Sequence, residues 1–237
     1  MLRIRPAAAL IFLFSLGAVA TSAVALPAPA ACLFVGAMDL HRLPDGSLTD
    51  SPLPEDQQRF VELARAARAR IAATFGPAEA TPALVFFTHP EGIGPFRLNA
   101  YGSTPTIGGR ACVMVGPNGQ NINVVAHELM HAELHRRVGY FKRWLQLPAW
   151  FDEGVAMQVD YRSRYALAEQ DAAGADAVQK LNTFSAFRSG DGKTVVANYA
   201  RAKYVVAAWL RRVGVKSFYP RLERMRRGES FAEAMAE

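Results

Sequence analysis

The stretch HELMHAELHRR, residues 127–137, decides how this chain is interpreted, because its histidines recur at every fourth position. In a helix, residues four apart stand on one face, so the ring nitrogens of His127 and His131 can converge on one ion. Glu128 follows the first histidine and faces the same cleft. This H-E-x-x-H spacing is typical of zinc hydrolases, in which two neutral imidazoles bind zinc and the glutamate takes a proton from the zinc-bound water. We therefore predict His127 and His131 as zinc ligands and Glu128 as the general base.

The third histidine of the stretch, His135, lies eight residues after His127, which is about 12 Å along a continuous helix. That is too far for both to bind one zinc at about 2.1 Å, and no glycine interrupts residues 132–134. We expect His135 to be an ordinary helix-face residue or to support a ligand from behind. The isolated His41 and His89 are interpreted as surface or loop residues.

Catalytic zinc usually has three protein ligands and leaves a fourth position to water. Glu153, within LPAWFDEGVAMQ at residues 147–158, is the best candidate for the third ligand. Between His131 and Glu153 lie 21 residues, enough to finish one helix, turn at Gly139 and return antiparallel. Pro148 can begin the second helix, because proline is tolerated in a first turn.

The neighbours of Glu153 complete this prediction. Trp150 and Phe151 are expected to pack the second helix against the first, and Gly154 would let the two helices approach closely. Asp152 is the competing carboxylate, which we interpret as an exposed acid near a helix N-terminus. We therefore favour Glu153 over Asp152 as the third ligand.

Together, HELMH and the later PAWFDEGVA resemble the gluzincin zinc peptidases, and most of all the peptidase MA-like family. That family pairs H-E-x-x-H with W-x-x-E-G-x-A, and Trp150, Glu153, Gly154 and Ala156 match the second motif. The resemblance implies a zincin-like pair of active-site helices around Zn²⁺, with a peptide or protein as substrate.

The resemblance continues downstream of these motifs. Residues 198–214 are similar to the family's tyrosine-headed helix, and residues 218–235 to its closing helical segment. It implies that Tyr199 donates a hydrogen bond to the tetrahedral oxyanion, with Tyr204 as the rival and an ordinary core tyrosine as the alternative. Before about Ala111, the chain resembles nothing that we can name.

Substrate specificity is only partly implied. Exopeptidase members recognise a substrate amino terminus with a G-x-M-E-N strand, and GRACVMVGPNGQN (109–121) has no such glutamate. The resemblance therefore favours an endopeptidase. The CVMVG strand could be a sheet edge that pairs with an extended peptide, or an ordinary strand. Arg201 could bind a substrate carboxylate or be a solvated helix residue.

The remaining pattern predicts an α+β fold, with a small sheet, the zincin-like helix pair and a mostly helical C-terminal part. Periodic apolar residues predict a helix over 55–75, and Ser230 with Glu233 forms a capping-box pattern for a last helix. We expect strands within 32–43, 83–88 and 111–115, loops at 89–109 and 182–193, and a helix from near Asn123. The expected division is a signal peptide at 1–25, a catalytic subdomain at 26–165 and a helical C-terminal subdomain at 166–237 that closes the cleft.

The N-terminus predicts export. Arg3 and Arg5 precede an apolar run, and an A-x-A cleavage site follows at residues 23–25. The apolar part is short for a membrane span, so we favour a cleaved signal peptide over an uncleaved anchor, and a periplasmic or secreted protein. No other stretch is long and apolar enough to span a bilayer. Cleavage removes two arginines from a formal charge of +6 and leaves +4. No nucleic-acid motif accompanies that charge, so no nucleic-acid partner is expected.

The two cysteines, Cys32 and Cys112, favour one disulfide in an exported protein. A lipid-modified Cys32 is the rival, although Pro29 stands where a lipoprotein has an aliphatic residue, and two free thiols are the third alternative.

The sequence thus predicts an exported zinc-dependent metallopeptidase. The alternatives are a catalytically idle zinc-binding interaction module and a zinc amidohydrolase that acts on a non-peptide amide. The presence of Glu128 argues against the idle module, because a purely structural zinc needs no base.

Overall fold

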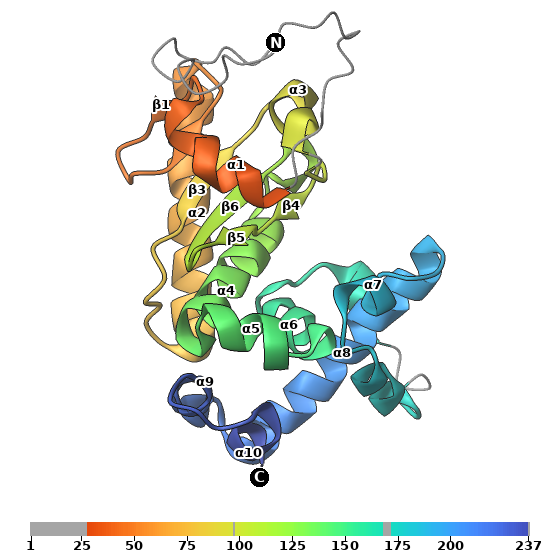
Figure 1. The fold of residues 1–237 in the computed structure, drawn as a ribbon. Coiled ribbons are helices and arrows are strands. Elements are labelled where there is room, and N and C mark those ends of the chain that lie inside the picture. The colour runs from red at the N-terminus through yellow and green to blue at the C-terminus, as the bar shows by residue number, and fades with distance from the viewer. Residues whose placement is uncertain (1–27, 97, 168–171, 237) are drawn as a thin grey trace, which may run out of the picture. The chain divides into compact units, whose positions relative to one another are not determined.

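The computed structural model describes residues 28–96, 98–167 and 172–236, and it has the expected α+β fold, mostly helical with one small mixed sheet (Figure 1). The predicted signal peptide, residues 1–25, lies outside the described residues. A search of the described helices found none that combines the length and the apolar character of a membrane span.

The sheet has six strands in the order β1-β2-β3-β6-β4, and β5 pairs with the start of β6. Strand β3 runs parallel to both β2 and β6, whereas the other pairings are antiparallel. Two of these strands, β3 and β6, confirm the strands predicted within residues 83–88 and 111–115. The strands are β1 (His41–Arg42), β2 (Leu48–Thr49), β3 (Ala83–Phe86), β4 (Gly102–Ser103), β5 (Thr106–Ile107) and β6 (Arg110–Val115).

Strand β6 lies inside the sheet. On one side its residues 112–115 pair with β3. On the other side Met114 and Val115 pair with β4, and Arg110 and Ala111 pair with β5. The backbone hydrogen-bonding groups of β6 are therefore used within the sheet. The expectation that the CVMVG strand could be an edge for an extended peptide is wrong, because its neighbours already occupy that edge.

Several helices follow the sequence pattern closely. The predicted helix over 55–75 is α2, the helix from near Asn123 is α4, and the capping box of Ser230 with Glu233 begins α10. The α-helices of the described residues are α1 (Ala28–Phe34), α2 (Pro54–Phe75), α3 (Pro90–Ile93), α4 (Ile122–Val138), α5 (Tyr140–Gln146), α6 (Ala149–Ala156), α7 (Phe184–Phe187), α8 (Gly192–Val213), α9 (Phe218–Arg226) and α10 (Phe231–Met235).

The predicted strand within 32–43 is wrong for most of its length. Helix α1 continues to Phe34, a 3-10 turn follows at Val35–Ala37, and only His41–Arg42 forms a strand. A short apolar run does not distinguish a strand from a helix segment, and the alanines just before this one, Ala30 and Ala31, favour a helix.

The two predicted loops also contain short elements. Pro90 opens α3, and β4 and β5 follow, so residues 89–109 are only partly irregular. In the second loop Asp191 caps α8, because its side chain accepts a hydrogen bond from the backbone N–H of Thr194 at 2.8 Å. Helix α8 consequently starts at Gly192, and Tyr199 lies about two turns inside it. The expectation that Tyr199 heads this helix is wrong.

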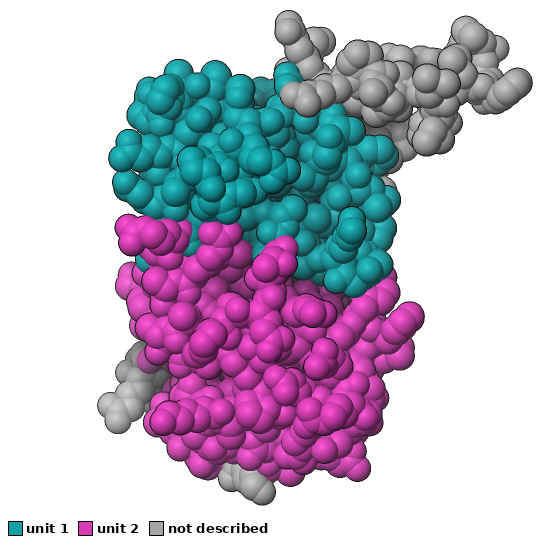
Figure 2. All heavy atoms as spheres, turned by 90° about the vertical axis from the view of Figure 1, so that its left-hand side faces the viewer, with its two compact units in different colours: residues 1–64, 82–125 teal, residues 65–81, 126–237 magenta. Residues whose placement is uncertain are grey.

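The chain divides into two compact units, which Figure 2 shows in different colours. Unit 1 comprises residues 1–64 and 82–125 and contains the whole sheet. Unit 2 comprises residues 65–81 and 126–237. The boundaries of these two units differ from those of the expected subdomains, 26–165 and 166–237.

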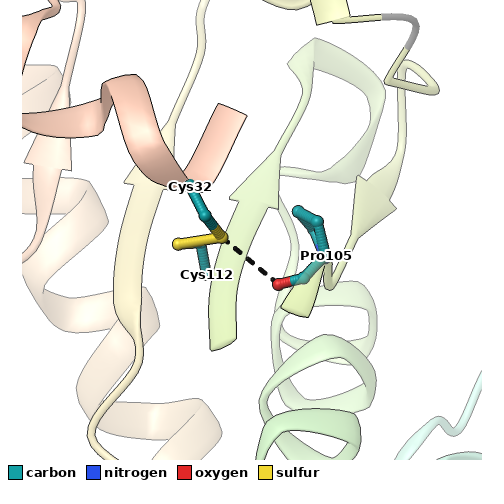
Figure 3. The surroundings of a disulfide bond; sticks show 3 residues. All are labelled: Cys32, Pro105 and Cys112. Atoms are coloured by element: carbon teal, nitrogen blue, oxygen red, sulfur yellow. Dashed lines mark hydrogen bonds between the residues drawn. A yellow bond between two sulfur atoms is a disulfide. The ribbon is translucent and has the colours of Figure 1, made fainter. Parts of the chain in front are cut away.

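A disulfide joins Cys32 of α1 to Cys112 of β6 in unit 1, with the two Cα atoms 5.6 Å apart (Figure 3). This confirms the predicted bond, and neither cysteine is a free thiol. The Cys32 sulfur also lies 3.3 Å from the Pro105 carbonyl oxygen, a contact in which a bonded sulfur has no hydrogen to donate. Both cysteines pack into one apolar cluster with Val85 and Met114. A disulfide between these cysteines indicates an oxidising compartment.

Unit 2 is held partly by a buried ion pair on α4. Glu133 has no exposed surface, and it accepts hydrogen bonds from the backbone N–H groups of residues 79–80 and from the Arg137 guanidinium. Arg137 in turn contacts Glu223 at 3.0 Å and lies 3.6 Å from the centre of the Tyr219 ring. These bonds fix the segment after α2 and helix α9 to α4.

We predict that replacing Cys32 and Cys112 together by serine lowers the free energy of unfolding by about 2–5 kcal/mol, because the open chain gains conformational entropy. Urea denaturation of protein purified from an oxidising compartment measures this change. Adding reductant should bring the wild type to the stability of the double variant and leave the variant itself unchanged. Two titratable thiols in unreduced native protein would contradict the prediction.

Candidate metal centre

Helix α4 holds its histidines rigidly. It begins after Asn121, whose side-chain oxygen accepts hydrogen bonds from the N–H groups of residues 123–124, the typical role of an N-cap. From residue 124 to residue 138, every side chain except that of Arg136 is buried. Gly139 then ends the helix at φ +89°, which confirms the predicted turn. His127 and His131 thus stand one turn apart in a helix that is packed on all sides.

Helix α6 presents Glu153, but its packing differs from the prediction. Phe151 contacts the rings of Trp209, Phe218 and Phe231, which belong to α8, α9 and α10. A Cβ atom at Gly154 would lie 2.7 Å from the Ala202 carbonyl oxygen and 2.6 Å from Val206, both on α8. The expectation that these residues pack α6 against the H-E-x-x-H helix is therefore wrong. The aromatic residues and the glycine fit α6 to the C-terminal helices instead.

Three side-chain atoms of unit 2 form a triangle. The Nε2 atoms of His127 and His131 lie 3.1 Å apart, and Oε2 of Glu153 lies 3.3 Å and 3.4 Å from them. Ligand atoms about 2.0–2.2 Å from a tetrahedral zinc lie about 3.3–3.6 Å from one another. The two distances to Oε2 lie within this range and the distance between the imidazoles is slightly shorter, so the three atoms could hold one metal ion.

The state of Glu153 supports the same interpretation. The residue has no exposed surface, and among the described residues its Oε2 atom has no hydrogen-bond partner. Burial alone would raise the pKa of Glu153, but the interactions with His127 and His131 hold that pKa well below its usual value. A buried, charged oxygen without a donor is costly, and a cation at the triangle would satisfy it. These three residues could hold a metal ion.

Asp152 corrects another prediction. It is not an exposed first-turn acid but is only 1 % exposed, and its two oxygens lie 2.6 Å from Nδ1 of His131 and 3.0 Å from Nε2 of His135. Burial opposes its charge, yet the two histidines hold its pKa well below the usual range. A neutral His131 that donates its Nδ1–H to this carboxylate has its lone pair on Nε2, the atom that faces Glu153. Carboxylates often orient metal-binding histidines in this way.

His135 supports this carboxylate. It is 5 % exposed, and burial lowers its pKa to about 4 against the attraction of Asp152, so its imidazole is neutral at pH 7. His131, His135 and Asp152 form a second group that could hold a metal ion. In that group both carboxylate oxygens already have imidazole partners, whereas Glu153 Oε2 has none. We therefore favour the first group, and that His135 shares no ion with His127 stays a prediction.

Arg188 is a site residue that the sequence did not predict. It follows α7, and its Nη2 donates a hydrogen bond at 2.9 Å to Oε1 of Glu153, the oxygen outside the triangle. Its side chain is 54 % exposed, so one end is fixed and the rest faces solvent. Burial lowers its pKa, but the charge of Glu153 more than offsets this and raises the pKa above its usual value. No local motif marks this arginine, because its partner lies 35 residues earlier.

Asp160 is a second residue that was missed. It is fully buried, and one carboxylate oxygen lies 3.8 Å from Nδ1 of His127, a ring nitrogen that has no hydrogen-bond partner among the described residues. The guanidinium of Arg162 binds the same carboxylate. A carboxylate therefore stands behind each of the two histidines of the triangle, at hydrogen-bond distance from one and slightly beyond it from the other.

Glu128 and Tyr199 lie close to this centre. Glu128 is 8 % exposed, and its charge helps to raise the pKa of both Arg188 and Tyr199. The Tyr199 ring is 6.3 Å from the His127 ring, and burial, followed by the charge of Glu153, raises its pKa well above 10. The rival Tyr204 is 41 % exposed.

The remaining sequence candidates differ in exposure. His41 and His89 are exposed, as predicted, and Arg201 is half-buried. Comparison of the chain with protein-family models, with curated proteins and with solved structures found no match.

We predict that Asp152→Asn weakens Zn²⁺ binding by about 10- to 100-fold, because the amide no longer carries the charge that orients His131. Competition with a chromophoric chelator measures the affinity, and circular dichroism checks the fold. Asp176→Asn, at an exposed position, is the matched control and should bind like the wild type. Equal affinity of a folded Asp152→Asn variant and this control would contradict the orienting role.

Proposed function

We propose that the chain is an exported, zinc-dependent metallopeptidase that cleaves peptide bonds as an endopeptidase. The observation that carries the proposal is the triangle of His127, His131 and Glu153, with Glu128 on the same turn of α4. Two imidazoles and one carboxylate are a usual donor set for catalytic zinc, which needs a fourth position for water or substrate. The resemblance of HELMH and PAWFDEGVA to gluzincin peptidases supports the same assignment.

Each residue near the centre has a separate role in this proposal. Bound zinc would supply a Lewis acid for the scissile carbonyl and lower the pKa of a water. Glu128 accepts the proton of the attacking water and passes it to the leaving amine. Asp152 keeps the Nε2 lone pair of His131 directed at the triangle, and Arg188 balances the charge on the outer oxygen of Glu153.

Tyr199 is proposed to act on the transition state. A phenol with a raised pKa stays protonated at neutral pH, so it can donate a hydrogen bond to the oxyanion that forms at the scissile carbon. Its position inside α8, beside the His127 ring, supports this role.

Two further observations bear on specificity and location. Residues 109–121 lack the glutamate with which related exopeptidases bind a free amino terminus, which supports cleavage within a peptide. The disulfide between Cys32 and Cys112 fits an oxidising compartment such as the periplasm or the exterior. The disulfide agrees with the predicted signal peptide.

We predict that Glu128→Gln lowers kcat for peptide cleavage by at least about 100-fold and leaves zinc content unchanged, because it removes the base but no ligand. Wild type and variant are incubated with a random peptide library, and zinc is measured on the same samples. Glu62→Gln, at an exposed position of α2, is the matched control.

The alternatives give different outcomes in that experiment. An idle zinc-binding module would leave the library intact with either protein, and a non-peptide amidohydrolase would cleave only a parallel set of N-acyl amides. Cleavage that survives Glu128→Gln would also rule out the proposed base.

We predict that Tyr199→Phe lowers kcat by about 10²- to 10³-fold with little change in KM, because the lost hydrogen bond forms only in the transition state. Steady-state kinetics on a peptide found in the library screen measures both constants. Tyr204→Phe, on the same helix, is the control and should behave like the wild type. A lower kcat for Tyr204→Phe than for Tyr199→Phe would mean that Tyr204, and not Tyr199, donates the hydrogen bond to the oxyanion.

A further inference from the structure

Helix α5 exposes an apolar face that no predicted role explains. Phe141, Trp144 and Leu145 are 76 %, 57 % and 79 % exposed. They occupy positions i, i+3 and i+4 of the helix, so they lie on one side of it. Five large apolar side chains of the described residues are more than half exposed, and three of them stand on these seven residues. We call these three side chains the apolar face of α5.

Packing within unit 2 contributes little to the stability of α5. No residue of α5 is buried, and a seven-residue helix has little stability of its own in water. Lys142 ties it to the segment after α9, because its Nζ atom donates hydrogen bonds to the carbonyl oxygens of Gly228 and Glu229 at 3.1 Å and 3.4 Å. The helix is therefore held at its polar side, while Phe141, Trp144 and Leu145 remain mostly exposed.

A cluster of positive charge accompanies the apolar face. Residues 136–146 and 223–229 contain seven Arg or Lys and two Glu, a net charge of +5 out of +6 for the whole chain. Both glutamates are already paired, Glu223 with Arg137 at 3.0 Å and Glu229 with Arg224 at 2.6 Å. Three of the arginines, Arg136, Arg226 and Arg227, are exposed, and we call them the basic rim.

The combination of features selects one kind of partner. An apolar face of Phe, Trp and Leu with basic residues around it is the composition of helices that lie in the interface of an anionic membrane. Tryptophan is enriched at that depth, and basic residues are attracted by anionic headgroups. Three side chains fall far short of the roughly 20–30 residues per partner in a stable protein interface.

We propose that α5 docks on the surface of an anionic lipid bilayer, with Phe141, Trp144 and Leu145 among the headgroups and the basic rim against lipid phosphates. The inference does not depend on the proposed peptidase activity. A peptidase held in this way would meet substrates at the membrane surface.

Vesicle binding by the chain purified after export tests this proposal, with the N-terminus of every preparation checked by mass spectrometry. Vesicles of phosphatidylethanolamine with phosphatidylglycerol are compared with vesicles of phosphatidylcholine alone. The chain should bind the anionic vesicles, and added salt should weaken binding. Phe141→Ser/Trp144→Ser/Leu145→Ser should lose at least about tenfold in affinity, because its apolar contacts are gone.

Matched variants separate the parts of the surface. Leu33→Ser/Leu53→Ser removes exposed apolar side chains elsewhere, 64 % and 49 % exposed, and should bind like the wild type. Arg226→Gln/Arg227→Gln should weaken binding several-fold to anionic vesicles only and reduce its salt dependence. Trp144 is the most exposed of the three tryptophans, so its fluorescence emission should shift to shorter wavelength on anionic vesicles.

Several outcomes would overturn the proposal. They are no binding by the wild type, equal binding by the triple serine variant, and binding that ignores lipid charge. Loss of a dimer in the triple variant, measured by light scattering, together with no vesicle binding by the wild type would instead make this surface a contact between copies of the chain. Because circular dichroism checks the fold of each variant and the wild type alone gives the salt dependence, a misfolded variant cannot decide the result.

Discussion

Two adjacent carboxylates buried on α6, Asp152 and Glu153, set the constraint on which the rest of unit 2 depends. Buried negative charge is tolerated only where cations or hydrogen-bond donors meet it. Side chains from three parts of the chain converge on this pair: the histidines of α4, Arg188 after α7 and, at greater distance, Arg143 of α5. Because residues 152 and 153 are consecutive, their side chains diverge, and each serves a different pair of histidines. His131 belongs to both pairs and couples them.

This arrangement explains which parts of the centre could be predicted from the sequence. The spacing of His127, His131 and Glu128 is local, so helix geometry alone brings them together. Glu153 required one further assumption, an antiparallel return of the chain. The role of Asp152 was misinterpreted because first-turn acids are usually exposed. The signal that could have revealed it is His135, since a third histidine one turn beyond the pair needs its own buried partner.

Long-range partners were beyond local reasoning. Arg188 and Asp160 carry no motif, and their contacts with Glu153 and His127 join residues more than 30 positions apart in the sequence. In the fold, the long helices α2 and α4 follow their apolar periodicity and caps, and the buried strands β3 and β6 follow their composition. Strands of two residues, such as β4 and β5, are too short for any period to be visible. Gly154 was recognised as a point of close approach, but its partner turned out to be α8.

The near-complete burial of α4 restricts how this chain can change over time. Of its residues from 124 to 138, only Arg136 has an exposed side chain. Helices in most proteins have a solvent side on which replacements accumulate with little effect. In α4 one side is occupied by the histidines and another by Glu133 and Arg137. Substitutions with little effect on stability are therefore confined to almost a single position. Sequences that descend from the same ancestor should therefore differ less along this helix than along α2, whose polar side remains open.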